Sequence, residues 1–555
     1  MNQQELIGLI MLAVLIGAIF IGFPISFTLL FLALGFGYWG LGESVFDLAY
    51  FNTIGMMKEE LLAAVPLFIF MGFMTEQAGL MERLFLAFRM LLAPIRGSLY
   101  LVVLLTATVF AMATGIVGAA VTVLGIMASP IMIKTGYDPK LSAGAITAGG
   151  TLGILIPPSV MLVVMGPVLG VSVADLYAGA FGPGFLLAGL YIAYTLIRSF
   201  INPSLGPPVP KEERTYTAGK MIWEVIAGTI PLLLLIGFTL GSILAGAATP
   251  TEAAGVGAAG AAVLAILYGR FNLRGLRQAV MSTAATSSMV LFLAVTSNVF
   301  GAVFARLGTA NWITNSMLSL QLPPTIMLLL IIGLIFLLGW PFEWPAIVLV
   351  FLPIFYPIVA ALKVDMVWFG VLVAVTLQTA FLSPPVAMSA YYLKQVVKDW
   401  SLGTIYAGMF EFMMLQCIAI LLLVFFPQIT DFMPAMVKLF RRNKSSSSKH
   451  NLPARQPLPH LHPAQAAALP TIKTLTKPMT RKKAGRRAHR RRLSPRPSLP
   501  SSKDSRRPVK PPRRRREMGQ SSRRLPESKS NNYRGAQRGA AVAQRRRFVF
   551  TFLLA

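Results

Sequence analysis

Apolar residues follow one another along this chain in long continuous stretches, without the alternation of apolar and polar positions that marks a half-buried strand. Inside a bilayer every backbone N–H and C=O group must find its partner within the protein, so apolar runs of about 20 residues predict membrane-spanning helices. We expect such helices over residues 5–22, 24–41, 61–80, 141–166, 181–201, 223–245, 252–269, 280–305, 367–390 and 403–427. The pattern therefore predicts an all-α polytopic membrane protein.

Two further apolar stretches, 98–130 and 325–360, are too long for a single span. Each is interrupted near its middle by residues that break helices, "ATGIVGAA" at Ala113–Ala120 and "LGWPFEWP" at Leu338–Pro345. This combination predicts two re-entrant helical hairpins. One long tilted helix, or two short full spans, is the alternative that the pattern leaves open for each stretch.

Two of the predicted spans are broken in the same way, by a double proline flanked by hydroxyl residues. The first break is "GTLGILIPPSVM" at 150–161, and the second is "QTAFLSPPVAMS" at 378–389. Proline lacks an N–H and clashes with the carbonyl one turn back, and freed carbonyls at membrane depth are tolerated only where they face protein or a water-filled cavity. The breaks therefore predict a site in which freed carbonyls and hydroxyls bind a hard cation, while helix N-termini favour a carboxylate.

The chain also contains an internal repeat. A shift of 227 residues, read from the numbering, superimposes Pro130 on Pro357 and Asp138 on Asp365, and it aligns the two double prolines. A hairpin, an inner proline, an aspartate at a helix start and a double-proline break thus recur in the same order. Such repeats in opposite membrane orientations are a common architecture of secondary transporters.

The distribution of basic residues supports opposite membrane orientations for the two copies of the repeat. If each hairpin begins and ends on one side of the membrane, one side carries Arg83, Arg89, Arg96, Lys134, Lys140, Arg198, Lys211, Arg214, Lys220, Arg270, Arg274, Arg277, Lys394 and Lys398. The other side then carries only Lys58, Arg306, Lys363 and Lys438. Because cytoplasmic loops are enriched in Lys and Arg, the first side is predicted to be cytoplasmic.

The candidate ion- and solute-binding residues come from the two hairpin tips and the two breaks. They are Thr114, Gly115 and Gly118 at the first tip, Gly150, Thr151, Pro157, Pro158 and Ser159 at the first break, Gly339 and Glu343 at the second tip, and Gln378, Thr379, Ser383, Pro384 and Pro385 at the second break. Sodium would bind backbone carbonyls and hydroxyls of this set. Close helix packing is the alternative role for each glycine.

Composition divides the chain into two pieces. The 555 residues have a mean hydropathy of +0.66 and a formal net charge of +29, and all of that charge lies in residues 441–555. This Arg-, Ser- and Pro-rich tail cannot bury a core. It is either an arm for nucleic acid or anionic lipid, or the product of a frameshift, which we favour. Nucleic acid is not an expected partner, because the last predicted span ends outside.

The residues before the tail offer little for catalysis. All four histidines lie in the tail, and Cys417 is the single cysteine of the chain. A membrane enzyme or metalloenzyme would need a cluster of such groups. We therefore expect no enzyme activity and no cofactor, with sodium acting only as the coupling ion. A channel would also fit broken helices, but paired hairpins in a repeat favour alternating access.

Several motifs carry a resemblance to a known family. "PLFIFMGFMTEQAGLMERL" (66–84), "GTLGILIPPS" (150–159), "GVSVADLYAGAFGPG" (170–184), "ATPTEAAGVGA" (248–258) and "LQTAFLSPPVA" (377–387) resemble the large membrane subunit, DctM-type, of TRAP transporters. "TLGILIPPSVMLVV" and "LQTAFLSPP" are most similar to the branch labelled mannitol/chloroaromatic, several of whose relatives take 2-oxo acids or lactate. The resemblance covers roughly residues 1–430.

The resemblance implies a sodium-driven, elevator-type importer of a small organic anion in the bacterial inner membrane. It implies two partners, a small four-helix membrane subunit and a periplasmic substrate-binding protein. The implied division is scaffold helices at 1–97 and 181–324, transport-domain repeats at 98–180 and 325–402, a last helix at 403–440, and the tail. A sodium- or proton-coupled anion carrier of the same fold that acts without a binding protein is the alternative function.

The charge distribution makes a topological prediction. In a chain whose Cys417 has been replaced by serine, single cysteines at Arg96→Cys and Arg306→Cys should react with a membrane-impermeant maleimide from opposite faces, position 96 from the cytoplasm. Labelling of intact cells and inside-out vesicles measures this. Reaction of both positions from one face would contradict the predicted arrangement of the hairpins.

Overall fold

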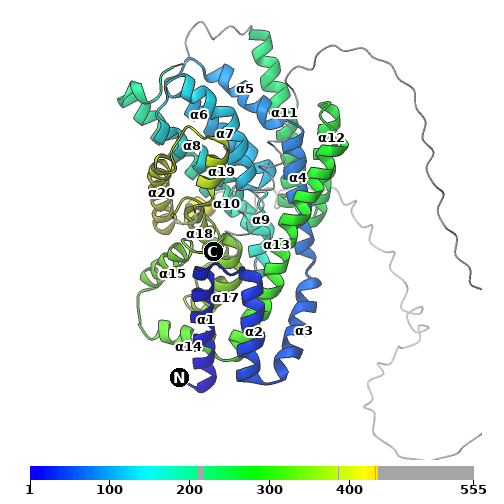
Figure 1. Ribbon diagram of the computed structural model, residues 1–555, viewed down its shortest axis with the longest axis vertical. Coiled ribbons are helices and arrows are strands. Elements are labelled where there is room, and N and C mark those ends of the chain that lie inside the picture. Colours follow the sequence, from blue (N-terminus) through cyan, green and yellow to red (C-terminus); the bar gives the residue numbers. More distant parts are fainter. Residues whose placement is uncertain (209–217, 385–386, 432, 436–555) are drawn as a thin grey trace, which may run out of the picture. The chain divides into compact units, whose positions relative to one another are not determined.

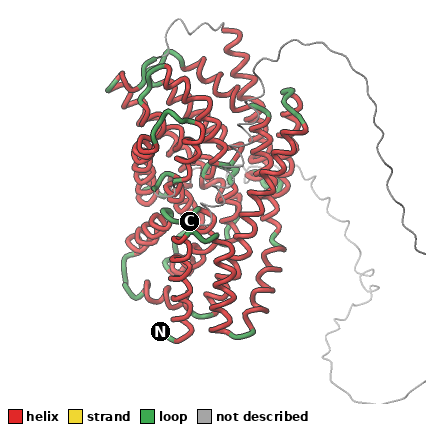
Figure 2. Tube along the Cα trace, in the orientation of Figure 1, coloured by secondary structure: helices red, strands yellow, loops and turns green. Residues whose placement is uncertain are grey.

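The computed structural model describes residues 1–208, 218–384, 387–431 and 433–435. Within these ranges every regular element is helical (Figure 2), which confirms the predicted all-α class. The tail at 441–555 and Pro385 lie outside the described residues, and so does the side chain of Thr114. The two interpretations of the tail therefore stay predictions.

One set of helices packs around the long helix α13 and is called the α13 bundle here. Helix α13 contacts α2, α3 and α4, while α12 packs on α4 and α11 packs on α5 (Figure 1). The bounds are α1 Gln3–Ile21, α2 Ile25–Leu41, α3 Ser44–Met57, α4 Ala64–Gln77, α5 Leu80–Leu92, α11 Ala218–Leu244, α12 Pro250–Leu267 and α13 Leu273–Arg306, with the 3-10 turn η1 at Glu60–Ala63 before α4.

A second set, called the hairpin bundle, contains both hairpins and both breaks. Its first part is α6 Ser98–Thr114, α7 Val117–Lys134, α8 Pro139–Thr151, η2 Leu152–Ile154, α9 Val160–Leu169, α10 Val173–Ile201 and η3 Pro203–Leu205. Its second part is α15 Pro324–Leu338, α16 Trp344–Ala346, the π-helix η5 Ile347–Phe351, α17 Leu352–Ala361, α18 Met366–Gln378, η6 Thr379–Phe381, α19 Met388–Val396 and α20 Leu402–Phe425. Helix α14, Thr309–Leu318, contacts α1, α13 and α17 and so joins the two bundles.

The internal repeat is confirmed in the helix boundaries. Asp138 caps α8 by accepting a hydrogen bond from the Leu141 N–H at 2.8 Å, and Asp365 caps α18 by accepting one from the Trp368 N–H at 2.8 Å. Both helices then run for 13 residues, end in a 3-10 turn, and resume as a short helix after the double proline. The two predicted spans at 141–166 and 367–390 are therefore both broken helices, as expected.

Within the described residues, helices long and apolar enough to cross a membrane are Gln3–Ile21, Glu60–Gln77, Val117–Lys134, Val173–Ile201, Ile222–Leu244, Pro250–Leu267, Leu273–Arg306, Trp344–Ala361 and Leu402–Phe425. Two of them, Val173–Ile201 and Leu273–Arg306, begin well before the predicted starts at 181 and 280. Helix α10 continues through Pro183, and α13 begins at the cap of Asn272, whose side chain accepts the Gly275 N–H at 2.7 Å. The first turns of α13 contain Arg274, Arg277 and Gln278, so their low hydropathy hid the true start.

Three helices were missed by the sequence analysis, namely α3, α5 and α14. Each has between 10 and 14 residues, shorter than a span. Their apolar positions alternate with polar ones such as Asp47, Arg83 and Asn315. A search for continuous apolar runs of about 20 residues passes over helices this short, and α5 and α14 are in addition amphipathic.

Small residues let α8 and α20 approach closely inside the hairpin bundle. A Cβ atom added to Gly408 would lie 2.0 Å from the Lys140 carbonyl oxygen, and one added to Gly144 would lie 2.7 Å from the Gly408 carbonyl oxygen. Close contact through glycine is typical of helix pairs in membranes, where packing rather than hydrophobic burial drives association.

This contact predicts that a leucine substitution will destabilise the protein at one glycine of α20 and not at another. Gly408→Leu should destabilise the protein by about 1–3 kcal/mol, because the side chain has no room against the α8 backbone. Gly403→Leu is the matched control, since a Cβ there would have only the Ser401 hydroxyl near it, at 3.9 Å. The apparent melting temperature in detergent measures both, and equal melting temperatures would contradict the close packing.

Candidate ion- and solute-binding site

The tip of the first hairpin lies against the first break. Gly115 ends α6 in the left-handed conformation, with φ 60°, which glycine adopts without strain. A Cβ atom at Gly115 would lie 3.5 Å from the Pro158 carbonyl oxygen and 3.7 Å from the Gly153 carbonyl oxygen. Two backbone oxygens of the break therefore point toward the hairpin tip.

The double proline accounts for the Gly153 oxygen, and the cap of α9 accounts for the Pro158 oxygen, because the Leu162 N–H four residues later donates to the Ser159 hydroxyl oxygen. Pro157 and Pro158 have no N–H to donate to the carbonyls of Gly153 and Ile154, four residues earlier. The Ser159 hydroxyl donates to the Ile154 carbonyl instead, and its oxygen accepts the Leu162 N–H at 3.4 Å as the cap of α9. The Tyr177 hydroxyl donates to the Ser159 carbonyl at 3.2 Å and so fixes the start of α9 from α10.

The second hairpin repeats the arrangement. A Cβ atom at Gly339 would lie 3.1 Å from the Cβ of Ala380, so the second tip packs on the second break. The Ser383 hydroxyl donates to the Thr379 carbonyl, and the Thr379 hydroxyl donates to the Thr376 carbonyl at 2.7 Å. In each break, hydroxyl groups of the break itself donate hydrogen bonds to nearby backbone carbonyls.

Gln378 stands out among the polar residues of the second break. Its side chain is fully buried, and within the part of the chain that the structure describes neither its amide nitrogen nor its amide oxygen has a hydrogen-bond partner. Leaving a buried amide unpaired costs about 1–3 kcal/mol, so such a group calls for an explanation. Gln378 ends α18 as Thr151 ends α8, which places the two residues at equivalent points of the repeat.

Both tips and both breaks open onto one small pocket of about 140 Å³. The first repeat contributes the tip residues Gly115 to Gly118 together with Ile154 and Val160. The second repeat contributes the tip residues Glu343 to Pro345 together with Phe381, Met388 and Tyr392. Val160 and Met388 are the first residues of α9 and α19, so both half-helices begin at this pocket.

The α13 bundle closes the remaining side of the pocket. Ile69 of α4 and Thr286, Met289 and Val290 of α13 line it there. The sequence analysis missed these residues and Tyr392, because it drew the site only from the repeat. The ring of Tyr392 lies against the first hairpin tip, 2.9 Å from where a Cβ of Gly118 would be. No periodic signal in α13 distinguishes its pocket-facing residues from ordinary packing positions.

The structure places most of the predicted residues in three groups, and Thr114, Pro384 and Pro385 fall outside them. Gly115, Gly118 and Glu343 line the pocket. Thr151, Pro157, Pro158, Ser159, Gln378, Thr379 and Ser383 are buried in the breaks behind it. Gly150 and Gly339 are packing positions, and a Cβ at Gly150 would lie 2.3 Å from the Val121 side chain of α7. Pro384 is exposed, while Pro385 and the Thr114 side chain lie outside the described residues.

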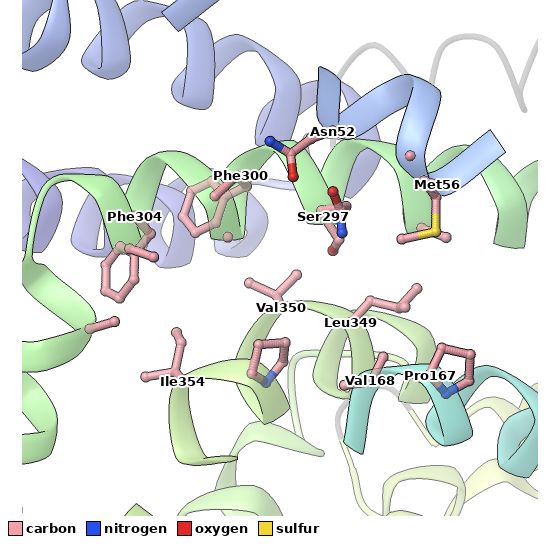
Figure 3. A pocket seen from close by; sticks show the side chains of 18 of the residues that line it. Asn52, Met56, Pro167, Val168, Ser297, Phe300, Phe304, Leu349, Val350 and Ile354 are labelled. Carbon is pink, nitrogen blue, oxygen red and sulfur yellow. The ribbon is translucent and has the colours of Figure 1, made fainter. Parts of the chain in front are cut away.

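A second and larger cavity of about 540 Å³ lies between α3 and α13 on one side and α9, η5 and α17 on the other (Figure 3). None of the predicted site residues lines this cavity in the described structure. It is therefore separate from the pocket at the hairpin tips.

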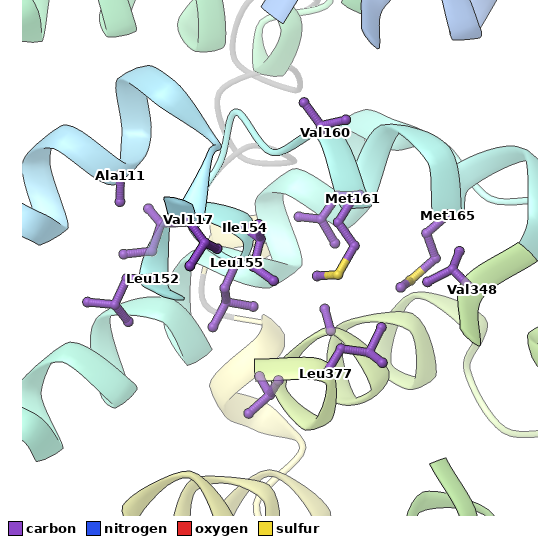
Figure 4. Close-up of a cluster of buried hydrophobic side chains, with 14 of the residues drawn as sticks. Ala111, Val117, Leu152, Ile154, Leu155, Val160, Met161, Met165, Val348 and Leu377 are labelled. Atoms are coloured by element: carbon purple, nitrogen blue, oxygen red, sulfur yellow. The ribbon is translucent and has the colours of Figure 1, made fainter. Parts of the chain in front are cut away.

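A shared core joins the two repeats behind the small pocket. Figure 4 shows side chains of α6, α7, η2 and α9 from the first repeat meeting Val348 and Leu377 of the second. Leu155, Met161 and Leu377 are at most 1% exposed. The two breaks are therefore held in one packed unit, and a displacement of one would disturb the other.

Fold and site together define a class, a polytopic membrane transporter with paired helical hairpins and paired broken helices. Comparisons with known proteins identify the family within this class. Residues 10–429 match the family model described as "Tripartite ATP-independent periplasmic transporter, DctM component". The chain belongs to this family, the large permease components of tripartite transporters, and is a multi-pass protein of the bacterial inner membrane. The resemblance noted in the sequence is thereby confirmed at the level of the family.

Individual relatives agree with the family. The sialic acid TRAP transporter large permease protein SiaM of Vibrio cholerae is 29% identical, over 76% of this chain and 97% of that protein. The C4-dicarboxylate TRAP transporter large permease protein DctM of Pseudomonas aeruginosa is 29% identical, over 67% of this chain and 86% of that protein. Among solved structures, the Alcanivorax borkumensis YdaH transporter matches with a TM-score of 0.47 at 18% identity, covering 69% of this chain and 88% of that one.

Proposed function

We propose that the chain is the large subunit of a sodium-coupled importer that moves a small organic anion. The observation that carries the proposal is the convergence of both hairpin tips and both half-helix starts, at Val160 and Met388, on one pocket. Helix N-termini present unpaired N–H groups and a partial positive charge, which favour a carboxylate. The volume of about 140 Å³ is below the roughly 300–1,000 Å³ of sites for drug-sized ligands, and suits a small solute.

The sodium ion is assigned to the breaks behind the pocket. Sodium, like other hard cations, prefers oxygen ligands. The Gly153 and Pro158 carbonyls lie next to the first tip, the Ser159 hydroxyl lies beside the freed Ile154 carbonyl, and the Thr379 and Ser383 hydroxyls bring further oxygens to the second break. The buried, unpartnered Gln378 amide supplies a further oxygen in the second break. No cofactor besides the coupling ion is proposed.

Glu343 has a separate role in this proposal. Among the described residues that line the pocket it is the one with a carboxyl group. An ionised carboxylate would repel an anionic solute at short range, so it must face either the bound cation or a hydrogen-bond donor of the solute. A hydroxyl beside the carboxylate of the solute, as in a lactate-like acid, would supply that donor, whereas a 2-oxo acid would not.

The partners and the mechanism follow from the family. We propose a small four-helix membrane subunit and a periplasmic substrate-binding protein as partners, and an elevator motion of the segments 98–180 and 325–402. Helices α10 and α20 pack on α18 and α8, so we propose that residues 181–201, assigned above to the scaffold, and α20 move with these two segments. Relatives are named for sialic acid and for C4-dicarboxylates, both acidic solutes, which supports an organic anion here. We propose that the chain acts as a transporter subunit and not as an enzyme.

Hydroxyl removal in the breaks should weaken sodium binding. Ser159→Ala and Thr379→Ala each remove one oxygen ligand and should raise the sodium concentration for half-maximal thermal stabilisation roughly tenfold, about 1.4 kcal/mol. Pro157→Ala and Pro384→Ala should abolish the stabilisation, because an added N–H would let the helix close over the carbonyls. Melting of the purified protein in sodium chloride, against potassium chloride, measures this.

Two control variants separate ligation from local structure. Ser401→Ala removes the cap of α20, where the Ser401 hydroxyl accepts the Thr404 N–H at 3.0 Å, and Thr376→Ala removes a hydroxyl that donates to the Leu372 carbonyl at 2.9 Å. Both should keep the sodium response of the unchanged protein. Unaltered sodium responses in both proline variants would show that the breaks serve only helix packing. That result would contradict the proposed sodium site.

Transport by the isolated chain is the second test. In liposomes with an inward sodium gradient, the purified chain alone should take up no radiolabelled lactate, pyruvate or succinate, because the small subunit and the binding protein are missing. Addition of both partners from the same genome should start sodium-dependent uptake of at least one carboxylate. Robust uptake by the single polypeptide would instead favour the alternative, a carrier of this fold that needs no binding protein.

A further inference from the structure

The larger cavity lies between the two bundles and has two chemically different walls (Figure 3). The wall from the hairpin bundle is entirely apolar in the described structure, and consists of Pro167, Val168, Leu349, Val350, Pro353 and Ile354. A water molecule in a cavity needs two to four polar partners, which this wall cannot supply. Hydrocarbon would gain dispersion contacts with it that an empty space forfeits.

The opposite wall, from α3 and α13, mixes apolar and polar groups. Asn52, Ser297 and Asn298 lie on it among phenylalanine and methionine side chains. Ser297 is 1% exposed, and within the described residues its hydroxyl has no hydrogen-bond partner. The Asn52 amide nitrogen donates to the Leu48 carbonyl at 2.8 Å, which leaves its amide oxygen available. This wall can therefore contact a ligand that has both polar and apolar parts.

Charge restricts the ligand further. Glu59 is the one charged residue among those that line the described cavity. A phosphate or carboxylate head group without a compensating cation would be repelled by it, whereas an ammonium group would be attracted. The surrounding helices, α13 and the segment Trp344–Ala361, are candidate membrane spans, so lipid is the solvent from which the ligand would come.

We propose that this cavity binds an acyl chain of an amine-headed phospholipid. The chain lies along the apolar wall, and the ammonium group faces Glu59. Such a lipid touches both bundles at once. The site is independent of the pocket at the hairpin tips and does not rest on the identity of the transported solute.

Glycines on the cavity wall allow a direct test. Gly301 and Gly55 both line the cavity, and a Cβ atom at either would have nothing within 4 Å. A leucine at these positions would fill the space without a clash, and it would favour the helix over glycine. Gly35 of α2 has equally open surroundings but does not line the cavity, so Gly35→Leu is the matched control.

The experiment uses the purified full chain in phosphatidylcholine nanodiscs that contain a trace of phosphatidylethanolamine with a photoreactive acyl chain. Crosslinks mapped by mass spectrometry should concentrate in residues 51–59 and 294–305. They should fall at least about fivefold in Gly301→Leu and in Gly55→Leu, and stay unchanged in Gly35→Leu. The same photoreactive chain on phosphatidylglycerol should label less, and Glu59→Gln should remove that difference.

Three results would overturn the proposal. Crosslinks spread evenly over the lipid-facing helices would mean that the cavity holds no preferred chain. Equal labelling of the cavity segments in both leucine variants and the control would mean that the labelled lipid lies outside the cavity. Equal labelling by the two head groups in the unchanged protein would contradict the role of Glu59.

Discussion

The structure depends on how backbone groups are paired where helices break inside a membrane. Two prolines in succession remove two N–H donors, and in lipid the freed carbonyls have no water to turn to. In the first break the Ser159 hydroxyl donates to the Ile154 carbonyl, which Pro158 cannot do. In the second break the Ser383 hydroxyl donates to the Thr379 carbonyl, which the backbone N–H groups of Leu382 and Ser383 also reach. The oxygens of Gly153 and Pro158 are instead turned toward the hairpin tip at Gly115. The proposed sodium site rests on this arrangement of carbonyl and hydroxyl oxygens and uses no acidic ligand in the breaks.

Small residues make the convergence of tips and breaks geometrically possible. Gly115 brings the first tip within van der Waals distance of the break backbone, and Gly150 lets α8 lie directly on α7. Gly408 and Gly144 do the same between α20 and α8. The fold therefore holds its site through close backbone contact in the hairpin bundle, with α13 supplying a separate wall for the pocket.

Much of this architecture could be predicted from the sequence, because the strongest signals are steric and local. Proline pairs, the aspartates at 138 and 365, and the 227-residue shift are enough to locate both broken helices and both hairpins. The contribution of α13 could not be predicted. Thr286, Met289 and Val290 sit on a long apolar helix, where nothing in the sequence separates a pocket-facing residue from a packed one. Gly150 packs directly on Val121 of α7, and its predicted part in ion binding stays a prediction.

The central claim is that the breaks of the two repeats bind sodium beside the pocket formed by the hairpin tips. Density maps of the purified protein recorded in sodium chloride and in potassium chloride test it most directly. The account predicts a sodium-dependent peak in contact with the Gly153 or Pro158 carbonyl oxygen, next to Gly115, and a second beside Gln378. Identical maps at both breaks, or sodium-dependent density only elsewhere in the protein, would contradict it.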